Sequence, residues 1–166
     1  MSNNIQQQTT INIQEKANLI WAIADKLVGV YKPHEYGNVI LPMCVIKRFE
    51  DTLAPTKQAV LDTNAKLDKD GIVVKKGFLE TAAGQQLYNL SPFTFQSLLN
   101  DPENIKENFE SYLNHFSENV IDIIHRMDFD RELQKMADNN VLYLVIKEFC
   151  TSKAYLGADL VTSVDM

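Results

Sequence analysis

Hydrophobic residues recur at helical spacing along most of the chain. In residues 14–29 the apolar side chains return every three or four positions, and Gly29 supplies a stop signal behind them. Residues 39–49 are apolar nearly all round, which is typical of a helix in the middle of a bundle. Pro42 should either start or kink that second helix. The pattern therefore predicts a helix over each of these two segments.

The second half of the chain contains further helix signals. A capping residue followed by proline occurs at Ser91-Pro92 and again at Asp101-Pro102, and each pair predicts a helix start. Ser117 is expected to cap another helix. Two more are predicted over residues 131–138 and 141–150. The fold class that follows is all-α, a compact multi-helix bundle.

Residues 68–84 form the least helical stretch. They contain three glycines and a short β-branched run, Ile72 to Val74, with lysines on both sides. We expect an irregular exposed loop or a small hairpin here. Pro55 and Thr56 open the more polar segment that precedes it. For domain organisation we expect a flexible N-terminus over residues 1–13, one helical domain over 14–159, and a connection to a further domain over 160–166.

Composition limits the classes of function. Apolar residues make up 45% and charged residues 23% of the chain, as in ordinary globular proteins. The net charge of −6 means that any contact with DNA must come from a local patch. No apolar run reaches the roughly 18 residues of a membrane span, and the first ten residues do not resemble a secretory signal. The simplest expectation is a cytoplasmic protein without a membrane partner.

Candidate catalytic chemistry is weak throughout the sequence. Cys44 and Cys150 lie in apolar runs, which should raise the pKa of each thiol. The three histidines lack metal-ligand spacing, and no phosphate-binding glycine loop or nucleophile motif occurs. The acidic pairs Glu50-Asp51 and Asp128 with Asp130 are expected to be solvated or capping groups. We therefore assign no catalytic, cofactor-binding or metal-binding residues in this chain.

Aromatic and basic residues leave more than one interpretation open. The helical spacing of the aromatic residues between 93 and 116 predicts core positions rather than stacking platforms. Trp21, Tyr31 and Tyr36 are also expected in the core, with a role in the first interhelical turn as the alternative. The lysines at 66, 69, 75 and 76 could contact phosphates, but the favoured interpretation is that they are solvated side chains of an exposed loop.

Several segments, taken in order, resemble the opening domain of type I restriction-modification modification subunits. The match runs from about residue 14 to 159. It rests on residues 19–27 (LIWAIADKL), 31–42 (YKPHEYGNVILP), 53–57 (LAPTK), 88–95 (YNLSPFTF), 127–130 (MDFD) and 142–145 (LYLV). Ordered segments of this kind are far more specific together than any one alone.

The resemblance implies a subunit of a site-specific DNA adenine-N6 methyltransferase that uses S-adenosylmethionine. Its implied partners are a specificity subunit, a second modification subunit, a restriction subunit and double-stranded DNA. The family's Asn-Pro-Pro-Phe tetrad and its glycine-containing cofactor motif do not occur in these residues. We therefore expect this chain to be non-catalytic on its own and to hold no cofactor, with catalysis in a part beyond Met166.

The resemblance also suggests where contacts could lie. A rigid helical domain can present a face to DNA or to a partner subunit, and the candidate contact residues are Lys32, Lys47, Arg48, Lys75 and Lys76. The alternative from a different class is a stand-alone helical adaptor that binds only protein. Entry of the chain into a methyltransferase complex would separate the two.

Overall fold

A computed structural model describes the backbone of residues 2–151 and the side chains of residues 13–151. The longer helices are α1 (Ser2–Leu27), α2 (Gly37–Leu53), α3 (Lys57–Lys69), α4 (Lys76–Ala83), α6 (Ile105–Asn114), α7 (Glu118–Arg126), α8 (Phe129–Asp138) and α9 (Leu142–Glu148). Shorter turns of helix are α5 (Phe95–Leu98), η1 (Pro33–Glu35), η2 (Ala54–Thr56) and η3 (Pro102–Asn104). Within this part of the chain there is no β-strand, so the predicted all-α class is confirmed.

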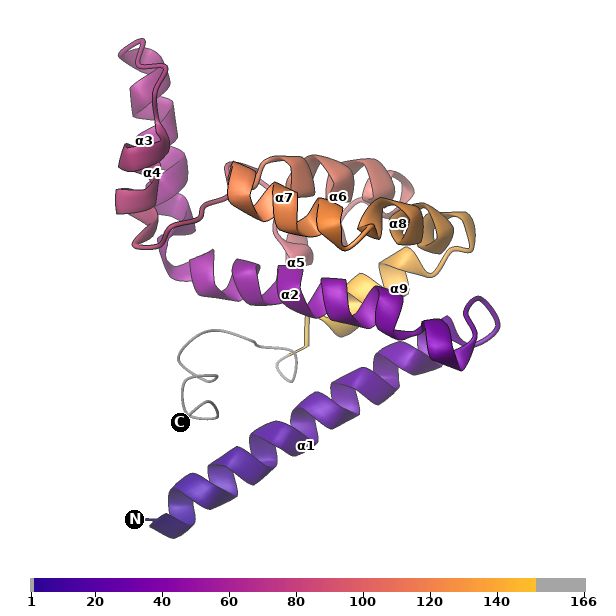
Figure 1. The fold of residues 1–166 in the computed structure, drawn as a ribbon. Helices are drawn as coiled ribbons and strands as arrows, with labels where there is room; N and C mark the ends of the chain where they lie inside the picture. Colours follow the sequence, from indigo (N-terminus) through magenta and orange to yellow (C-terminus); the bar gives the residue numbers. More distant parts are fainter. Residues whose placement is uncertain (1, 152–166) are drawn as a thin grey trace.

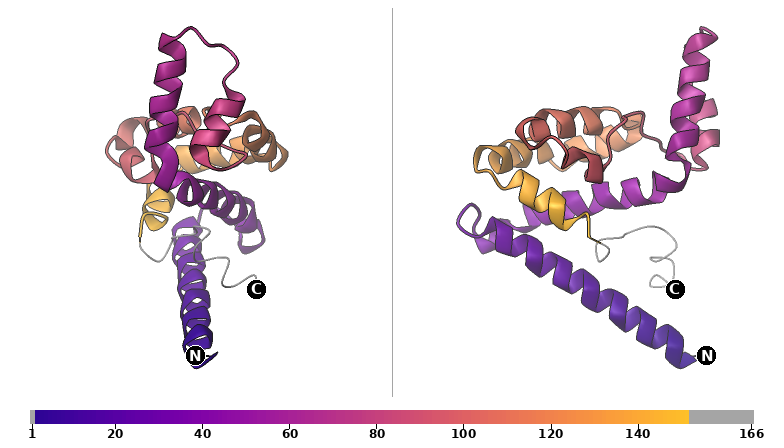
Figure 2. Two further views of the ribbon diagram at one scale, coloured as in Figure 1. Left: turned by 90° about the vertical axis from the view of Figure 1, so that its left-hand side faces the viewer. Right: turned by 180° about the vertical axis from the view of Figure 1, so that it is seen from behind.

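The helices form layers with one projecting arm. Helices α6, α7 and α8 lie together over α2 and α9, and α1 crosses beneath α9 (Figure 1). Helices α3 and α4 pack against each other and stand out from the end of α2 as an arm (Figure 2). The contacts of α1 with α9 and of α2 with α8 join the layers. The arrangement leaves both the arm and the first turns of α1 outside the body.

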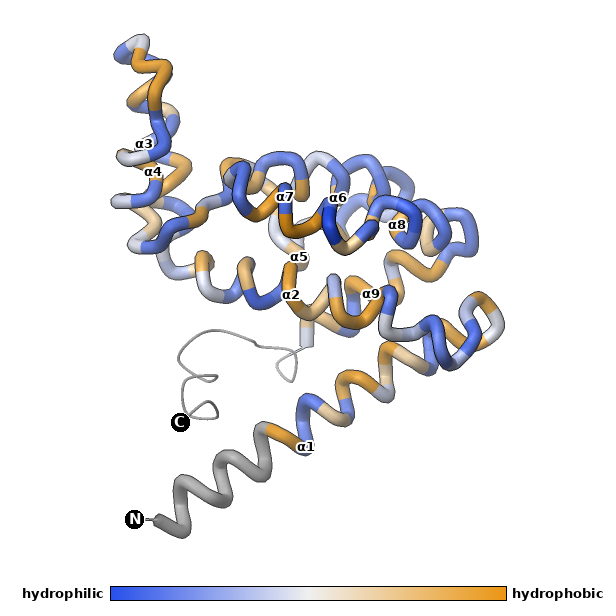
Figure 3. The backbone as a smooth tube through the Cα atoms, viewed as in Figure 1, coloured by the Kyte–Doolittle hydropathy of each residue, from blue (hydrophilic) through white to orange (hydrophobic). Residues whose placement is uncertain are grey.

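Aromatic side chains fill the centre of the body. The Phe95 ring meets Phe109, Tyr112 and Phe149 edge-on, at centroid distances of 5.8, 6.0 and 6.1 Å. Edge-to-face pairs of this kind stabilise a core beyond the area that they bury. Hydrophobic positions accordingly line α9 and the middle of α2, whereas hydrophilic positions mark the outer turns of α6 and α8 (Figure 3). The predicted core role of Phe95, Phe109 and Tyr112 is confirmed.

Helix α1 buries one narrow stripe. Leu19, Ile23 and Leu27 recur every four residues and are all buried. Trp21 lies on another side of the helix and is 75% exposed, so its predicted core position is wrong. The stripe can face the body only once per turn, and a position two residues from Leu19 points away from it. Tyr31 is buried as predicted, and Tyr36 is partly buried against the core.

The predicted helix starts are confirmed in two cases and wrong in one. Pro102 begins η3 directly before α6, and α7 follows Ser117. Near Ser91-Pro92, however, the helix begins only at Phe95, because Thr94 and Ser97 exchange hydrogen bonds as a capping box. Pro42 lies inside α2 and does not start it.

Residues 68–84 contain a helix that the sequence did not predict. The loop expected there is confined to the turn after α3, and Lys76–Ala83 is helical. Gly71 and Gly84 adopt left-handed φ angles of 71° and 68°, which end α3 and α4 and suit glycine. Leu79 and Ala83 give α4 its buried side, so the hairpin is made of helices rather than strands.

The structure describes one end of the chain more fully than the other. Helix α1 continues back to Ser2, so most of the expected flexible segment at residues 1–13 is helical; it contains no proline or glycine to interrupt a helix. Residues 152–166 lie outside the described part, and with them the expected connection at 160–166 and the end of the domain at 159. Among the helices of residues 2–151, none has the length and hydropathy needed to cross a membrane.

The orientation of α1 gives a direct test. Ile23 is fully buried, so Ile23→Ala should lower the free energy of unfolding by about 2–5 kcal/mol. Trp21→Ala removes a larger but exposed side chain and should change it by no more than about 0.5 kcal/mol. Urea unfolding followed by circular dichroism measures both values. Equal losses for the two variants would contradict the position of α1.

Candidate functional site

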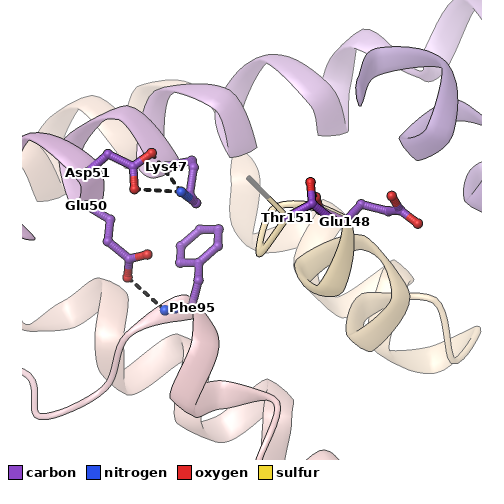
Figure 4. Close-up of polar contacts among 6 residues, drawn as sticks. All are labelled: Lys47, Glu50, Asp51, Phe95, Glu148 and Thr151. Carbon is purple, nitrogen blue, oxygen red and sulfur yellow. Dashed lines mark hydrogen bonds and ion pairs between the residues drawn. The ribbon is translucent and has the colours of Figure 1, made fainter. Parts of the chain in front are cut away.

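Two charged side chains of α2 are buried together in the body. The Lys47 ammonium donates hydrogen bonds to both oxygens of Asp51, at 2.6 and 2.7 Å, one helical turn away (Figure 4). Both residues are buried, and the Lys47 ammonium also lies 6.0 Å from the centre of the Phe95 ring. A charge removed from water needs such pairing, because an unpaired buried ion is strongly destabilising. This pair is therefore part of the core.

Glu50, next to Asp51, links α2 to α5. Its carboxylate accepts the backbone N–H of Phe95, the first residue of α5, at 2.8 Å. It also interacts with the Tyr112 hydroxyl of α6. Removal from water raises the pKa of Glu50, and the Phe95 N–H and the charges of Lys47 and Lys57 oppose this rise. One carboxylate thus connects three helices.

Lys57, at the start of α3, completes this group. Its ammonium donates to the carbonyl of Phe93 at 2.5 Å and lies 5.3 Å from the centre of the Tyr112 ring. Burial lowers the pKa of Lys57, and Glu50 acts in the opposite direction. Burial together with Glu50 raises the pKa of Tyr112 well above its ordinary value. We call Lys47, Glu50, Asp51, Lys57 and Tyr112 the charge cluster.

The two cysteines border the charge cluster without becoming reactive. Burial raises the pKa of Cys44 to about 11, and burial with the Glu50 charge raises that of Cys150 to about 11. The predicted rise is confirmed, and thiols in this state are poor nucleophiles at neutral pH. Glu50 and Asp51 were predicted to be solvated or capping groups. Asp51 is neither, because it pairs with Lys47 inside the fold, whereas Glu50 accepts the N–H of the first residue of α5 and so caps that helix. Asp128 and Asp130 are exposed, as expected.

The end of α9 is tied to α1 near this cluster. Thr151 donates its hydroxyl proton to the carbonyl of Glu148, and both residues lie at the end of α9 (Figure 4). The Glu148 carboxylate is 4.0 Å from the ammonium of Lys26 on α1. A partly exposed pair at this distance adds little stability. The contact sets orientation more than energy.

The five predicted contact residues do not come together. Lys47 belongs to the charge cluster, so its ammonium is not presented to a partner. Arg48 follows it on α2 and is exposed. Lys75 lies on the arm, where its ammonium contacts Asp68 and Asn64. Lys32 lies next to η1, at the end of the body opposite the arm.

Lys76 borders an open hollow between α4 and α7 that is mainly acidic. Its ammonium is 4.0 Å from Glu80, and Glu118 and Asp122 line the same hollow. These carboxylates also act on Tyr88, whose pKa is raised by burial, then by Glu80 and Glu118. We call this the acidic hollow. A polyanion is repelled by such surroundings, so Lys76 is poorly placed for DNA.

A second open hollow lies between η1 and α8. Its volume is about 510 Å³, and it is lined by Tyr31, Lys32, His34, Glu35 and Lys135 together with the backbone at residues 29–30. The Lys135 ammonium lies 4.3 Å from the centre of the Tyr31 ring and 3.9 Å from Glu35. We call this the basic hollow. Lys32, one of the predicted contact residues, lies here beside a second lysine, Lys135.

Metal and histidine chemistry gains no support from the geometry. Across the part of the chain that the structure describes, no three His, Cys, Asp or Glu side chains gather as a metal site would need. His115 is exposed, and its Nδ1 lies 2.6 Å from the carbonyl of Ser111. The strongest polar arrangement is thus the charge cluster, which connects helices.

Sequence reasoning missed the charge cluster and Lys135. Lys47 and Asp51 stand four residues apart on α2, a spacing at which opposite charges can pair, so this contact could have been predicted but its burial could not. Glu50 and Lys57 gave no such signal, because their partners lie 45 and 36 residues away. Lys135 likewise becomes notable only when α8 packs beside η1.

Comparison with known proteins gives one match. A family model described as the HsdM N-terminal domain matches residues 16–149, which is most of the chain. No curated protein and no solved structure matches significantly. The matched range contains α2 to α9 and the buried stripe of α1.

Breaking the Lys47–Asp51 pair should cost more than replacing it. Asp51→Leu leaves a buried ammonium without its partner and should lower the free energy of unfolding by about 3–5 kcal/mol. Lys47→Met with Asp51→Leu removes both charges and should recover most of that loss. Urea unfolding of the wild type, both single variants and the double variant gives the coupling. Additive effects of the two substitutions would contradict a buried pair.

The raised pKa of Glu50 predicts a dependence on pH. The folded state holds this proton more tightly than the unfolded state, so the associated stability is fully present below the ordinary glutamate pKa. It is lost as pH rises through the folded-state pKa. In Glu50→Gln the amide oxygen can still accept the Phe95 N–H, but the side chain does not titrate.

The stability of the wild type relative to Glu50→Gln should therefore fall as the pH rises from the ordinary glutamate pKa through the raised folded-state pKa of Glu50. Urea unfolding at closely spaced pH values measures the difference. Glu50→Gln also removes a negative charge beside Lys57. This changes the stability difference by a similar amount at each pH and does not change the direction of its dependence on pH. A difference that stays flat or grows with pH would show that Glu50 is not destabilised by burial.

Proposed function

The chain belongs to the HsdM N-terminal domain family, the N-terminal domain of type I restriction-modification modification subunits, and from this membership we propose its role. We propose that the domain helps its subunit assemble with a specificity subunit and close around DNA. Methylation of adenine at N6 with S-adenosylmethionine is then the activity of the complete enzyme. The observation that carries the proposal is the family match over residues 16–149.

The internal structure supports a positioning role. A domain that closes around DNA has to keep its faces fixed relative to the part that holds it. The charge cluster connects α2, α3, α5 and α6 through short polar contacts. The aromatic core joins α5, α6 and α9 in the same way. Such cross-linked helices behave as one rigid body in a larger assembly.

Methyl transfer itself is proposed for another part of the subunit. A base inside a duplex must be flipped into a pocket before it can be methylated. This chain has neither the Asn-Pro-Pro-Phe tetrad nor the glycine-containing cofactor motif of the family. Its two thiols are at least half-buried and the carboxylates of Glu50 and Asp51 are engaged inside the fold, which favours holding over catalysis.

The remaining partners follow from the type I context. A second modification subunit and a restriction subunit are proposed as members of the same assembly. The exposed side chains Trp21, Leu41, Val73, Val74 and Phe78 offer apolar surface on α1, α2 and the arm. Large exposed apolar residues are common where subunits meet.

Two binding experiments test whether this domain serves assembly while another part of the subunit binds the cofactor. Titration calorimetry of the 166-residue chain with S-adenosylmethionine should give no binding, whereas the full-length modification subunit should bind it. The cognate specificity subunit should co-purify with the full-length modification subunit. Micromolar binding of the cofactor to the isolated chain would contradict a purely positioning domain. Failure to co-purify would favour the stand-alone adaptor instead.

A further inference from the structure

We propose that the basic hollow is a contact site for the phosphate backbone of duplex DNA, with Lys32 as its principal free cation. This inference rests on the proposed function and names the surface through which the domain meets DNA. The hollow is formed by two segments that are distant in sequence, η1 and α8.

The turn at η1 fixes the position of Lys32. Pro33 occupies the first position of η1, and Lys32 before it is extended, with φ −80° and ψ 153°. The Lys32 backbone N–H donates to a Glu35 carboxylate oxygen at 2.9 Å, and the Glu35 backbone N–H donates to the Lys32 carbonyl at 2.8 Å. The backbone is therefore set, while the Lys32 ammonium contacts no partner among the residues that the structure describes. It is available to an incoming anion.

The other side of the hollow is equally well anchored. The Tyr31 hydroxyl donates to the backbone carbonyl of Glu132 on α8 at 3.3 Å, which holds the turn against that helix. Lys135 lies over the Tyr31 ring and near Glu35, so its ammonium points into the hollow. Arg131 lies one turn earlier on α8 and is largely exposed. Cations from two segments thus face the same space.

The charge of the hollow favours an anion even though the chain is acidic overall. Glu35 is already engaged, by the Lys32 N–H and by Lys135. Its pKa is lowered, first by that N–H and then, against desolvation, by the charges of Lys135, His34 and Lys32. Glu132 is buried and lies 3.5 Å from Arg131. Lys32 acts on Glu35 only through its charge, so its ammonium forms no ion pair among the residues that the structure describes.

The chemistry of the hollow fits a backbone contact rather than base recognition. The ring of Tyr31 is buried, so it offers no platform on which a base could stack. Lysine ammonium groups bind phosphate oxygens as point charges without reading the base sequence. The volume of about 510 Å³ is open to solvent and easily admits a phosphate group. A contact of this kind holds DNA without specifying its sequence.

The test uses the full-length modification subunit assembled with its specificity subunit. Binding to a labelled duplex that contains the recognition site is measured by fluorescence anisotropy over a range of salt concentrations. Loss of one phosphate contact reduces the salt slope by about 0.9, which corresponds to roughly five- to tenfold weaker binding near 0.1 M salt. We expect this change for Lys32→Gln, and we expect Lys32→Arg to remain close to the wild type.

Lys76→Gln is the matched control, because Lys76 is an exposed lysine beside the acidic hollow. It should change duplex affinity by less than about twofold, within the scatter of neutral surface changes. Millimolar inorganic phosphate should compete weakly, since a free anion lacks the neighbouring charges of a duplex. Unchanged duplex binding by Lys32→Gln, or equal losses for Lys32→Gln and Lys76→Gln, would overturn the inference.

Two further outcomes separate the inference from the proposed function. If Lys32→Gln weakens the affinity for the specificity subunit and leaves duplex binding unchanged, the hollow is a protein contact and the inference is overturned while the proposed function stands. If the wild-type assembly forms but retains no duplex, the proposed function fails and the inference fails with it. The thermal unfolding of Lys32→Gln should stay close to that of the wild type, because the exposed Lys32 ammonium acts on Glu35 only through its charge.

Discussion

Phe95 is held from two sides, and the arrangement of the other helices depends on that double hold. Its backbone N–H donates to Glu50 of α2, and its ring lies among Phe109, Tyr112 and Phe149 of α6 and α9. Helix α5, which it begins, has only four residues and could not persist alone. The carboxylate therefore places the ring, and the ring sets the spacing between α6 and α9. This small polar contact organises an apolar core.

The neighbouring Lys47–Asp51 pair is better understood as a constraint than as a source of stability. Hydrophobic residues of similar size can often replace a buried ion pair without loss. Lys47 and Asp51 lie one turn apart on α2, so they stay paired however the helix packs. A rotation of α2 would instead carry the Lys47 ammonium away from the face of the Phe95 ring. The constraint is therefore on which face of α2 meets the core.

The sequence predicted apolar features better than polar ones, for a physical reason. Phe109 and Tyr112 repeat at helical spacing, so their burial could be inferred locally, and this was confirmed. The prediction for Trp21 was wrong because it relied on the size of the side chain, although Trp21 lies on the side of the helix opposite the buried stripe of Leu19. Helix α4 was missed because glycine and valine outweighed the weak signal of Leu79. Glu50 and Lys135 depend on partners distant in sequence, which no local pattern reveals.

A net charge of −6 does not prevent this domain from meeting a polyanion. The acidic hollow lies between α4 and α7, beside the base of the arm, whereas the basic hollow lies at the other end of the body beside η1 (Figure 1). At physiological ionic strength the Debye length is about 8 Å, so carboxylates at one end scarcely weaken the field of cations at the other. Separation of charge along the body, rather than its sum, therefore decides which face a polyanion can approach. The carboxylates of the acidic hollow would repel a duplex that approached the body from that end.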